Sequence, residues 1–246
     1  MRYKELHPWD VSYKDAALLQ EKLRDGVIIR ALAGRPRVVA GADVAYSRLT
    51  NRVFAGIVIM DLRTMDVIEE STAVAEATFP YIPGLLSFRE APVLLRAFSR
   101  VDRAPDVILF DAQGIAHPRG LGLASHMGLI LDRPSIGCAK TLLVGEHRPV
   151  GDKVGASSYI LHKKRRIGAA LRTRSGVKPV FISPGHKTDI ASSIRIILKS
   201  CSRYRLPEPI RRAHNLVTLL RMRAEGNKKT AGHSGRSVTG TRGGSL

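Results

Sequence analysis

Two acidic residues lie in, or directly after, short apolar runs that have the composition of buried strands. Asp43 interrupts the run Val-Val-Ala-Gly-Ala-Asp-Val-Ala, and Asp111 directly follows Val-Ile-Leu-Phe. Burying a carboxylate is costly unless a partner compensates its charge. A cation is the usual partner, and oxygen ligands without cysteine favour Mg²⁺ or Mn²⁺. The pattern therefore constrains the chain to a fold that brings these two acids together.

Apolar runs and turn signals predict five strands in the first 140 residues. They are expected over residues 37–47, 52–61, 66–77, 106–110 and 135–138. The first three have short links, which favours an antiparallel meander. The fourth is wholly apolar, as buried parallel strands are, and Asp111 follows its carboxyl end, where α/β sheets place ligands. With helices over residues 88–101 and 120–131, this order predicts an α/β fold whose mixed sheet is flanked by helices.

Helical periodicity and stop signals predict three more helices, over residues 13–32, 189–204 and 210–223. Two late strands are expected over residues 167–173 and 178–183. From Glu225 onward the composition turns to Gly, Ser, Thr, Lys and Arg without apolar periodicity, which is typical of disorder. We therefore predict one domain over residues 1–224 and a basic, disordered tail over residues 225–246.

The charge balance favours a polyanionic partner. The chain has 40 Lys and Arg against 21 Asp and Glu, a formal net charge of +19, which speeds encounter with nucleic acid. The strongest basic run, Lys163-Lys164-Arg165-Arg166, is either a solvated loop or a surface that follows phosphates. Charge alone favours a generally basic protein, of the ribosomal type, that has no catalytic activity.

Cysteine usage and hydropathy favour an intracellular protein. Cys138 and Cys201 lie far apart, so neither a disulfide framework nor a zinc signature is indicated. The amino-terminal residues lack the apolar core of a signal peptide, and no apolar run is long enough to span a bilayer. We expect a soluble, cytoplasmic protein with no membrane partner.

Two further residues complete a possible hydrolytic site. Hydrolysis of a phosphodiester needs an activated water and a stabilised leaving oxygen, and divalent ions supply both. Glu90, near the start of a helix, is expected to complete the metal ligands of Asp43 and Asp111. Lys140, after an apolar strand, is expected to hold the water or a phosphate oxygen. For any single acid, a helix cap, turn acid or salt-bridge partner is the favoured alternative, but the apolar flanks of Asp43 and Asp111 weaken it.

Two loops suggest contacts with a nucleic acid. Tyr81 lies between Pro80 and the pair Ile82-Pro83, which makes it either a stiff wedge for a base stack or a core aromatic. From the residues alone the core aromatic is favoured. The glycine-rich loop over residues 111–122 is not a dinucleotide fingerprint, yet its N–H groups can approach a phosphate or base edge. Gly137-Cys-Ala-Lys140-Thr141 is not a P-loop, because the glycine before the lysine is missing.

The histidines give no metal signature. His117, His126, His186 and His214 are scattered without zinc spacing, and structural or hydrogen-bonding roles are favoured for each.

Six strings, in order from about His7 to His214, resemble the motifs of the endonuclease V family. They are Ala-Gly-Ala-Asp43-Val, the stretch Phe79-Pro-Tyr-Ile-Pro to Pro92, Gly114-Ile-Ala-His117-Pro-Arg-Gly to His126, Ile-Gly-Cys-Ala-Lys140, Ser-Pro-Gly-His186 and Tyr204-Arg-Leu-Pro-Glu-Pro209. The resemblance implies a ribonuclease-H-like fold and Mg²⁺-dependent cleavage, with Mn²⁺ as a substitute. It implies recognition of hypoxanthine (deoxyinosine) in DNA by base flipping. Cleavage at the second phosphodiester bond on the 3′ side would leave 3′-hydroxyl and 5′-phosphate ends.

The resemblance also assigns roles. Asp43, Glu90 and Asp111 take the metal-ligand positions, His214 matches a position near the metal, and Lys140 takes the catalytic lysine position. The substrate-binding positions are Pro80, Tyr81, Ile82, Pro83, Leu85, Gly114, His117, Gly122 and His126. One departure is Ala112, where the family usually has glycine; its methyl group is expected to narrow the base pocket.

We therefore expect a monomeric repair endonuclease whose catalytic domain spans residues 1–224 and whose partner is DNA containing deoxyinosine, with inosine RNA as a further substrate. Two alternatives remain. One is another ribonuclease-H-like nuclease, directed to inosine RNA or to junctions, and the other is a basic nucleic-acid-binding protein without catalysis.

Overall fold

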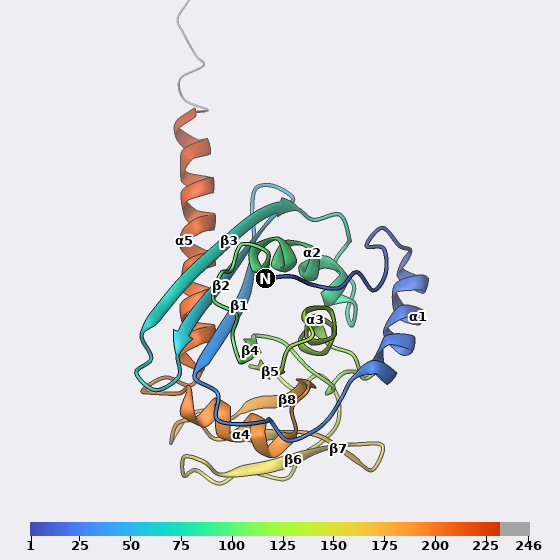
Figure 1. The fold of residues 1–246 in the computed structure, drawn as a ribbon, viewed down its shortest axis with the longest axis vertical. Helices are drawn as coiled ribbons and strands as arrows, with labels where there is room; N and C mark the ends of the chain where they lie inside the picture. The colour runs from blue at the N-terminus through green and yellow to red at the C-terminus, as the bar shows by residue number, and fades with distance from the viewer. Residues whose placement is uncertain (232–246) are drawn as a thin grey trace, which may run out of the picture.

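The computed structural model describes residues 1–231, with side chains up to residue 226. These residues form one eight-stranded mixed sheet with helices on both faces (Figure 1). The strand order across the sheet is β3-β2-β1-β4-β5-β8-β7-β6. The α/β fold expected from the sequence is confirmed. Most of the expected tail, residues 232–246, lies outside the described residues.

The amino-terminal half of the sheet is the expected meander. β1 (Val38–Tyr46), β2 (Arg52–Asp61) and β3 (Val67–Glu76) pair antiparallel in sequence order. β4 (Val107–Phe110) and β5 (Ser135–Ala139) then add in parallel, with Ala42 opposite Phe110 and Phe110 opposite Gly137. The residues that follow β4 and β5 therefore emerge beside Asp43 at one edge of the sheet.

Three antiparallel strands complete the other half. They are β6 (Ser157–His162), β7 (Arg165–Leu171) and β8 (Val180–His186), and β8 pairs with β5. The expectation of a strand starting at residue 167 missed both β6 and the start of β7. Lys163 and Lys164 both have positive φ angles, 49° and 64°, which is the geometry of a two-residue hairpin turn. The basic run is thus a hairpin tip rather than a long loop.

Helices cover both faces of the sheet. α2 (Leu86–Phe98) and α3 (Leu123–Leu131) pack with Ala40, Ala42 and Phe110 on one face. α4 (Ile190–Lys199) and α5 (Glu208–Ala231) pack on the opposite face, where the core includes Val39 and Leu109. The alternation of side chains along each strand produces these two cores.

The first helix is shorter than expected, because the chain forms long-range contacts instead. α1 (Tyr13–Leu23) continues only as a 3₁₀ turn over Arg24–Gly26, so the helix expected as far as residue 32 is wrong beyond this point. The backbone N–H of Ile28 donates to Nδ1 of His186 (3.2 Å), and the N–H of Leu32 donates to the Ser192 hydroxyl (3.0 Å). These bonds hold the segment extended against β8 and α4.

The last helix is longer than expected. Helix α5 continues to Ala231, beyond the end expected at residue 223, so its last residues fall within the segment for which a disordered tail was predicted. The Glu225 carboxylate accepts hydrogen bonds from the Ser47 hydroxyl (2.9 Å) and from the Arg48 N–H (2.8 Å). These contacts fix the helix to the turn after β1, and its end then extends away from the sheet (Figure 1).

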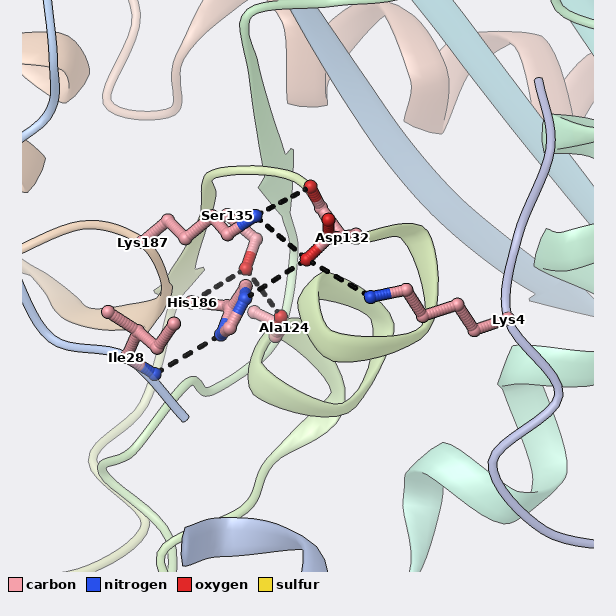
Figure 2. Close-up of polar contacts among 7 residues, drawn as sticks. All are labelled: Lys4, Ile28, Ala124, Asp132, Ser135, His186 and Lys187. Atoms are coloured by element: carbon pink, nitrogen blue, oxygen red, sulfur yellow. Dashed lines mark hydrogen bonds and ion pairs between the residues drawn. The ribbon is translucent and has the colours of Figure 1, made fainter. Parts of the chain in front are cut away.

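A carboxylate at the end of α3 ties distant segments together (Figure 2). Asp132 has a left-handed backbone, with φ of 53°, and caps α3. Its Oδ1 lies 2.7 Å from Lys187 Nζ, 3.6 Å from Lys4 Nζ and 3.8 Å from His186 Nε2. The Ser-Pro-Gly-His186 motif thus joins α3, β8 and the amino-terminal segment, and burial lowers the pKa of His186.

Within the described residues, none of the helices combines the length and the apolar character needed to cross a membrane.

Candidate active site

Three predicted acids converge at the edge of the sheet beyond β4. Asp43 on β1 and Asp111 after β4 are adjacent in the strand register, and their side chains are only 13% and 12% exposed. Glu90 comes from α2 and is buried. β4 ends at Phe110, one residue before Asp111, so an acid from α2 on one face of the sheet can approach the acids beside α5 on the other.

The pKa shifts show that the three acids interact. Burial raises the pKa of Asp43, and the negative charge of Asp111 raises it further. Burial also raises the pKa of Glu90 to about 8, and the charges of Asp43 and Asp111 add to the shift. Repulsion among buried carboxylates disfavours their joint ionisation unless positive charge is supplied.

Each acid has a donor partner. Lys140 Nζ donates to Asp111 Oδ2, and a ring nitrogen of His214, Nδ1, lies 2.8 Å from Asp43 Oδ2. The Tyr46 hydroxyl donates to Glu90 Oε1 over 2.6 Å. Lys140 follows β5 and His214 lies on α5, so five elements (β1, α2, β4, β5 and α5) contribute to this cluster.

The donor set suits a hard cation, although its geometry is not a closed ligand cage. Three carboxylates offer oxygen ligands only, the set that Mg²⁺ and Mn²⁺ prefer. Among the residues that the structure describes, no group of three or more His, Cys, Asp or Glu side chains is arranged so as to hold a metal ion. The electrostatic coupling of the acids, rather than a formed cage, is thus the observation that fits a divalent ion.

A pocket of about 160 Å³ adjoins the acids. Ala112 and Gln113, which follow Asp111, form part of its wall, as does Ser87, which lies one helical turn before Glu90. Five predicted substrate-binding residues line it, namely Tyr81, Ile82, Pro83, His117 and Gly122. The sequence therefore identified one side of this pocket.

Tyr81 is not a core aromatic. Its side chain is 70% exposed at the mouth of the pocket, and Pro80 beside it is also exposed. The loop that carries Tyr81 is anchored at both ends, because Arg89 donates to the Phe79 carbonyl (2.6 Å) and Arg119 donates to the Gly84 carbonyl (2.7 Å). The core-aromatic interpretation favoured from the residues alone is wrong.

His117 is held neutral in the pocket wall. The Arg119 N–H donates to its Nδ1 (3.2 Å), so its Nε2–H donates to the Gly84 carbonyl (3.0 Å). Burial, together with a smaller contribution from the charge of Arg119, lowers the pKa of His117 to about 4. Near neutral pH this histidine therefore presents an uncharged edge.

Four other predicted substrate-binding residues do not line the pocket, namely Pro80, Leu85, Gly114 and His126. Leu85 is buried against Phe79 and Phe88. A Cβ atom on Gly114 would lie 2.0 Å from the Pro184 carbonyl oxygen, so this glycine allows close packing onto β8. The motifs alone could not separate such packing positions from contact positions.

His126 supports the pocket from behind. It is fully buried, with Nδ1 3.0 Å from the Ser87 hydroxyl and Nε2 2.8 Å from Nε2 of His7. Nδ1 of His7 lies 2.7 Å from the Pro8 carbonyl and therefore carries the hydrogen. It follows that His126 donates to His7 and accepts from Ser87. Burial lowers the pKa of His126 to about 3.

Sequence reasoning missed several residues of the site. Tyr46 shares a strand with Asp43 but faces α2, so simple alternation along β1 was the available signal. Gln20 was missed because it lies far from the motifs; it is buried, lines the pocket and bonds to Arg119 (2.6 Å). Leu143, near Lys140, completes the wall and carried no signal.

The chain is similar over most of its length to proteins of one family. The sequence model of the family described as Endonuclease V matches residues 21–215. An endonuclease V of Methanothrix thermoacetophila is 49% identical over 223 residues, which cover 91% of this chain and 98% of the relative.

Solved structures agree with this match. The crystal structure of an endonuclease V from Bacillus subtilis superposes with a TM-score of 0.88 at 31% identity, covering 92% of this chain and 100% of that chain. Endonuclease V of Ciona intestinalis, solved with a 24mer DNA containing an inosine followed by a ribo-adenosine, gives a TM-score of 0.74 at 25% identity, covering 87% and 98%. This chain therefore belongs to the endonuclease V family and is a nuclease that hydrolyses phosphodiester bonds.

Proposed function

We propose that this nuclease recognises hypoxanthine in DNA and cuts the second phosphodiester bond on its 3′ side, leaving 3′-hydroxyl and 5′-phosphate ends. The observation that carries the proposal is the coupling of Asp43, Glu90 and Asp111 beside a small pocket. The net charge of +19 supports a nucleic-acid substrate. The Ciona relative, solved with inosine-containing DNA, supports the choice of base.

We propose that Asp43, Glu90 and Asp111 hold Mg²⁺, for which Mn²⁺ substitutes, with His214 at the edge of the site. When bound, a divalent ion activates water and stabilises the leaving oxygen. His214 restrains the Asp43 carboxylate by its contact at 2.8 Å. The Tyr46 hydrogen bond lowers the pKa of Glu90 against the effect of burial and so favours its ionised form.

Lys140 acts on the phosphate or on the attacking water. Its ammonium group binds Asp111 and its side chain is 44% exposed, so it is positioned to bind an incoming anion. A compact cation at this position stabilises the negative charge that develops on the phosphate oxygens. Its pairing with Asp111 holds it beside the other acids.

The pocket takes the base. At about 160 Å³ it is smaller than the pockets of ~300–1,000 Å³ that hold drug-sized ligands, and a single heterocycle suits it better than a whole nucleotide. Neutral His117, Ser87 and the backbone of Ala112 and Gln113 offer polar contacts among apolar neighbours. Tyr81, exposed on a restrained loop, fills the gap that the flipped base leaves in the stack.

The chain itself supplies the acids, the lysine and the pocket, which supports activity as a monomer. Sedimentation of the protein with and without substrate tests this. A concentration-dependent dimer that carries all the activity would exclude it.

End mapping tests the proposed function. Oligonucleotides with one inosine in duplex DNA, single-stranded DNA or RNA, and a four-way junction without inosine, are incubated with the enzyme and Mg²⁺. We expect a single cut at the second bond 3′ to inosine, lost in Asp43→Ala and retained in Asp25→Ala, which removes an acid whose side chain is 82% exposed. Cleavage of the junction alone, or no cleavage with Mg²⁺ and none when Mn²⁺ replaces it, would overturn the proposal.

A further inference from the structure

A second groove lies on the edge hairpin of the sheet, outside the acids and the base pocket. It has a volume of about 730 Å³ and is formed by the outer face of β6, by Arg166 of β7 and by residues 146–148. Tyr159 and Leu161 form its floor and are 48% and 41% exposed. Large aromatic and aliphatic side chains that are exposed next to each other on an edge strand indicate an interaction site.

The groove combines a flat aromatic with cations. The Arg166 guanidinium lies 4.4 Å from the centre of the Tyr159 ring, so the two planes form a preformed platform. Arg148 and His147 line the same groove, against one acid, Glu146. Among residues 1–226, neither Arg148 nor Arg166 forms an ion pair with a carboxylate. Their charges are therefore available to a ligand.

The platform lies near the catalytic edge of the sheet. Ala139, next to Lys140, pairs with Phe181, which pairs with Ala170, which in turn pairs with Ser158. Three interstrand spacings place Ser158 about 14 Å from Ala139. Tyr159 is the next residue, so a nucleic-acid strand of modest length can span both sites.

One segment connects the base pocket with the groove. Leu143 lines the base pocket, and Glu146, three residues later, lines the groove. Their Cα atoms are therefore at most about 11 Å apart. The Glu146 N–H donates to the Leu161 carbonyl (2.9 Å) and its carbonyl accepts from the Leu161 N–H (2.8 Å), which fixes the segment to β6.

We propose that this groove binds an unpaired nucleotide of the substrate strand, with its base stacked on the Tyr159–Arg166 platform and a neighbouring phosphate on Arg148. Stacking on aromatic side chains requires an unpaired base, and cations beside the platform follow the backbone. The groove thus selects substrates that are single-stranded next to the lesion. The claim that the bound nucleotide belongs to the inosine-containing substrate rests on the proposed function, whereas the affinity of the groove for single strands does not.

Binding of undamaged oligonucleotides tests the groove. Fluorescence anisotropy is measured with single-stranded and duplex DNA without inosine and with a chelator present, so neither metal nor base recognition enters. We expect Tyr159→Ala to weaken single-strand binding about tenfold, as loss of one stacked base does, and to leave duplex binding unchanged. Tyr159→Phe keeps the ring and should bind as the wild type does.

Two control variants separate stacking from general effects. Tyr13→Ala removes a tyrosine that is 57% exposed on α1 and should not change the binding of either DNA. Lys163→Ala removes a charge at the tip of the same hairpin and should affect single-stranded and duplex DNA equally. Arg166→Ala should weaken single-strand binding and also lower its salt dependence. Repeating the series with RNA shows whether the platform distinguishes the two sugars.

The outcomes are distinct from those of the proposed function. If Tyr159→Ala binds single strands as the wild type does, or loses single-strand and duplex binding equally while its melting temperature is unchanged, the groove inference is wrong. If the wild type fails to cut inosine but Tyr159→Ala still loses single-strand affinity, the groove inference stands and the substrate assignment fails.

Discussion

The Tyr46 hydroxyl donates a hydrogen bond of 2.6 Å to Glu90 Oε1, and this contact opposes the effect of burial on the Glu90 carboxyl. Burial and the charge of Glu90 raise the pKa of Tyr46 well above its usual value, so the phenol remains a donor. A strand residue thereby favours the charged form of an acid on a helix.

Replacing Tyr46 with Phe should weaken the metal site. Without the donor, the pKa of Glu90 rises above its value of about 8, and protons compete better with the cation. Loss of a hydrogen bond to a charged group costs about 1.5–3 kcal/mol, so about 10- to 100-fold more Mg²⁺ should be needed for half-maximal activity. The Mg²⁺ concentration needed for half-maximal activity should fall again as the pH is raised. An unchanged Mg²⁺ requirement across the pH range would contradict this role.

Replacing Lys140 with Met should reduce the rate of cleavage while the affinity for substrate stays near that of the wild type. Removing a charged donor from a developing oxyanion commonly costs about 10²–10³-fold in rate. Single-turnover kinetics and binding are measured separately, and Lys140→Arg, which keeps the charge, should recover part of the rate. A variant that loses affinity but keeps its single-turnover rate would assign Lys140 to binding alone.

Replacing Tyr81 with Ala should reduce cleavage at inosine more than it reduces affinity for undamaged duplex. The side chain is 70% exposed, so its removal should leave the melting temperature nearly unchanged. Tyr81→Phe retains the wedge and serves as the matched control. Equal losses of cleavage and of general affinity would show that Tyr81 contributes ordinary contacts to DNA.

Stability should fall as the pH drops below about 6.5, partly because of His126. Burial lowers the pKa of this histidine to about 3, whereas in the unfolded chain it is near 6.5. Between these values the unfolded state binds one more proton than the folded state, so His126 destabilises the fold by ~1.4 kcal/mol for each pH unit lost. The destabilisation by His126 is therefore absent only above about pH 6.5, where the histidine is neutral in both the folded and the unfolded chain.

Denaturant unfolding of the wild type and His126→Gln at several pH values measures this effect. The variant loses hydrogen bonds to Ser87 and His7 and should be less stable near neutral pH. Its stability should nevertheless depend less on pH between 6.5 and 4. Parallel curves for the two proteins would show that His126 does not contribute.

The sequence predicted those elements whose local pattern and burial agree. The meander and β4 were predicted because apolar runs, turns and the positions of Asp43 and Asp111 all pointed to one sheet. The amino-terminal helix was overextended because the bond from Ile28 to His186 joins residues 158 positions apart. Local periodicity contains no information about such a partner.

The residues of the candidate site differ in the same way: those in recognisable local motifs were predicted, and those placed by long-range packing were not. The acids and Tyr81 lie in distinctive local strings, whereas Gln20 reaches the pocket only through the packing of α1. Strand β6 was missed because its Ser157, Tyr159 and Leu161 are exposed and do not form an apolar run. Helix α5 passed its expected end because Glu225 contacts the turn after β1.

The central claim is that Asp43, Glu90 and Asp111 form one cation-binding unit. Calorimetric titration of Mn²⁺ into the wild type, Asp43→Asn, Glu90→Gln and Asp111→Asn tests it without any substrate, and Asp25→Asn serves as the control. The account predicts that each of the three variants loses most of the Mn²⁺ affinity while the control binds as the wild type does. Unchanged Mn²⁺ affinity in all three variants would contradict the account.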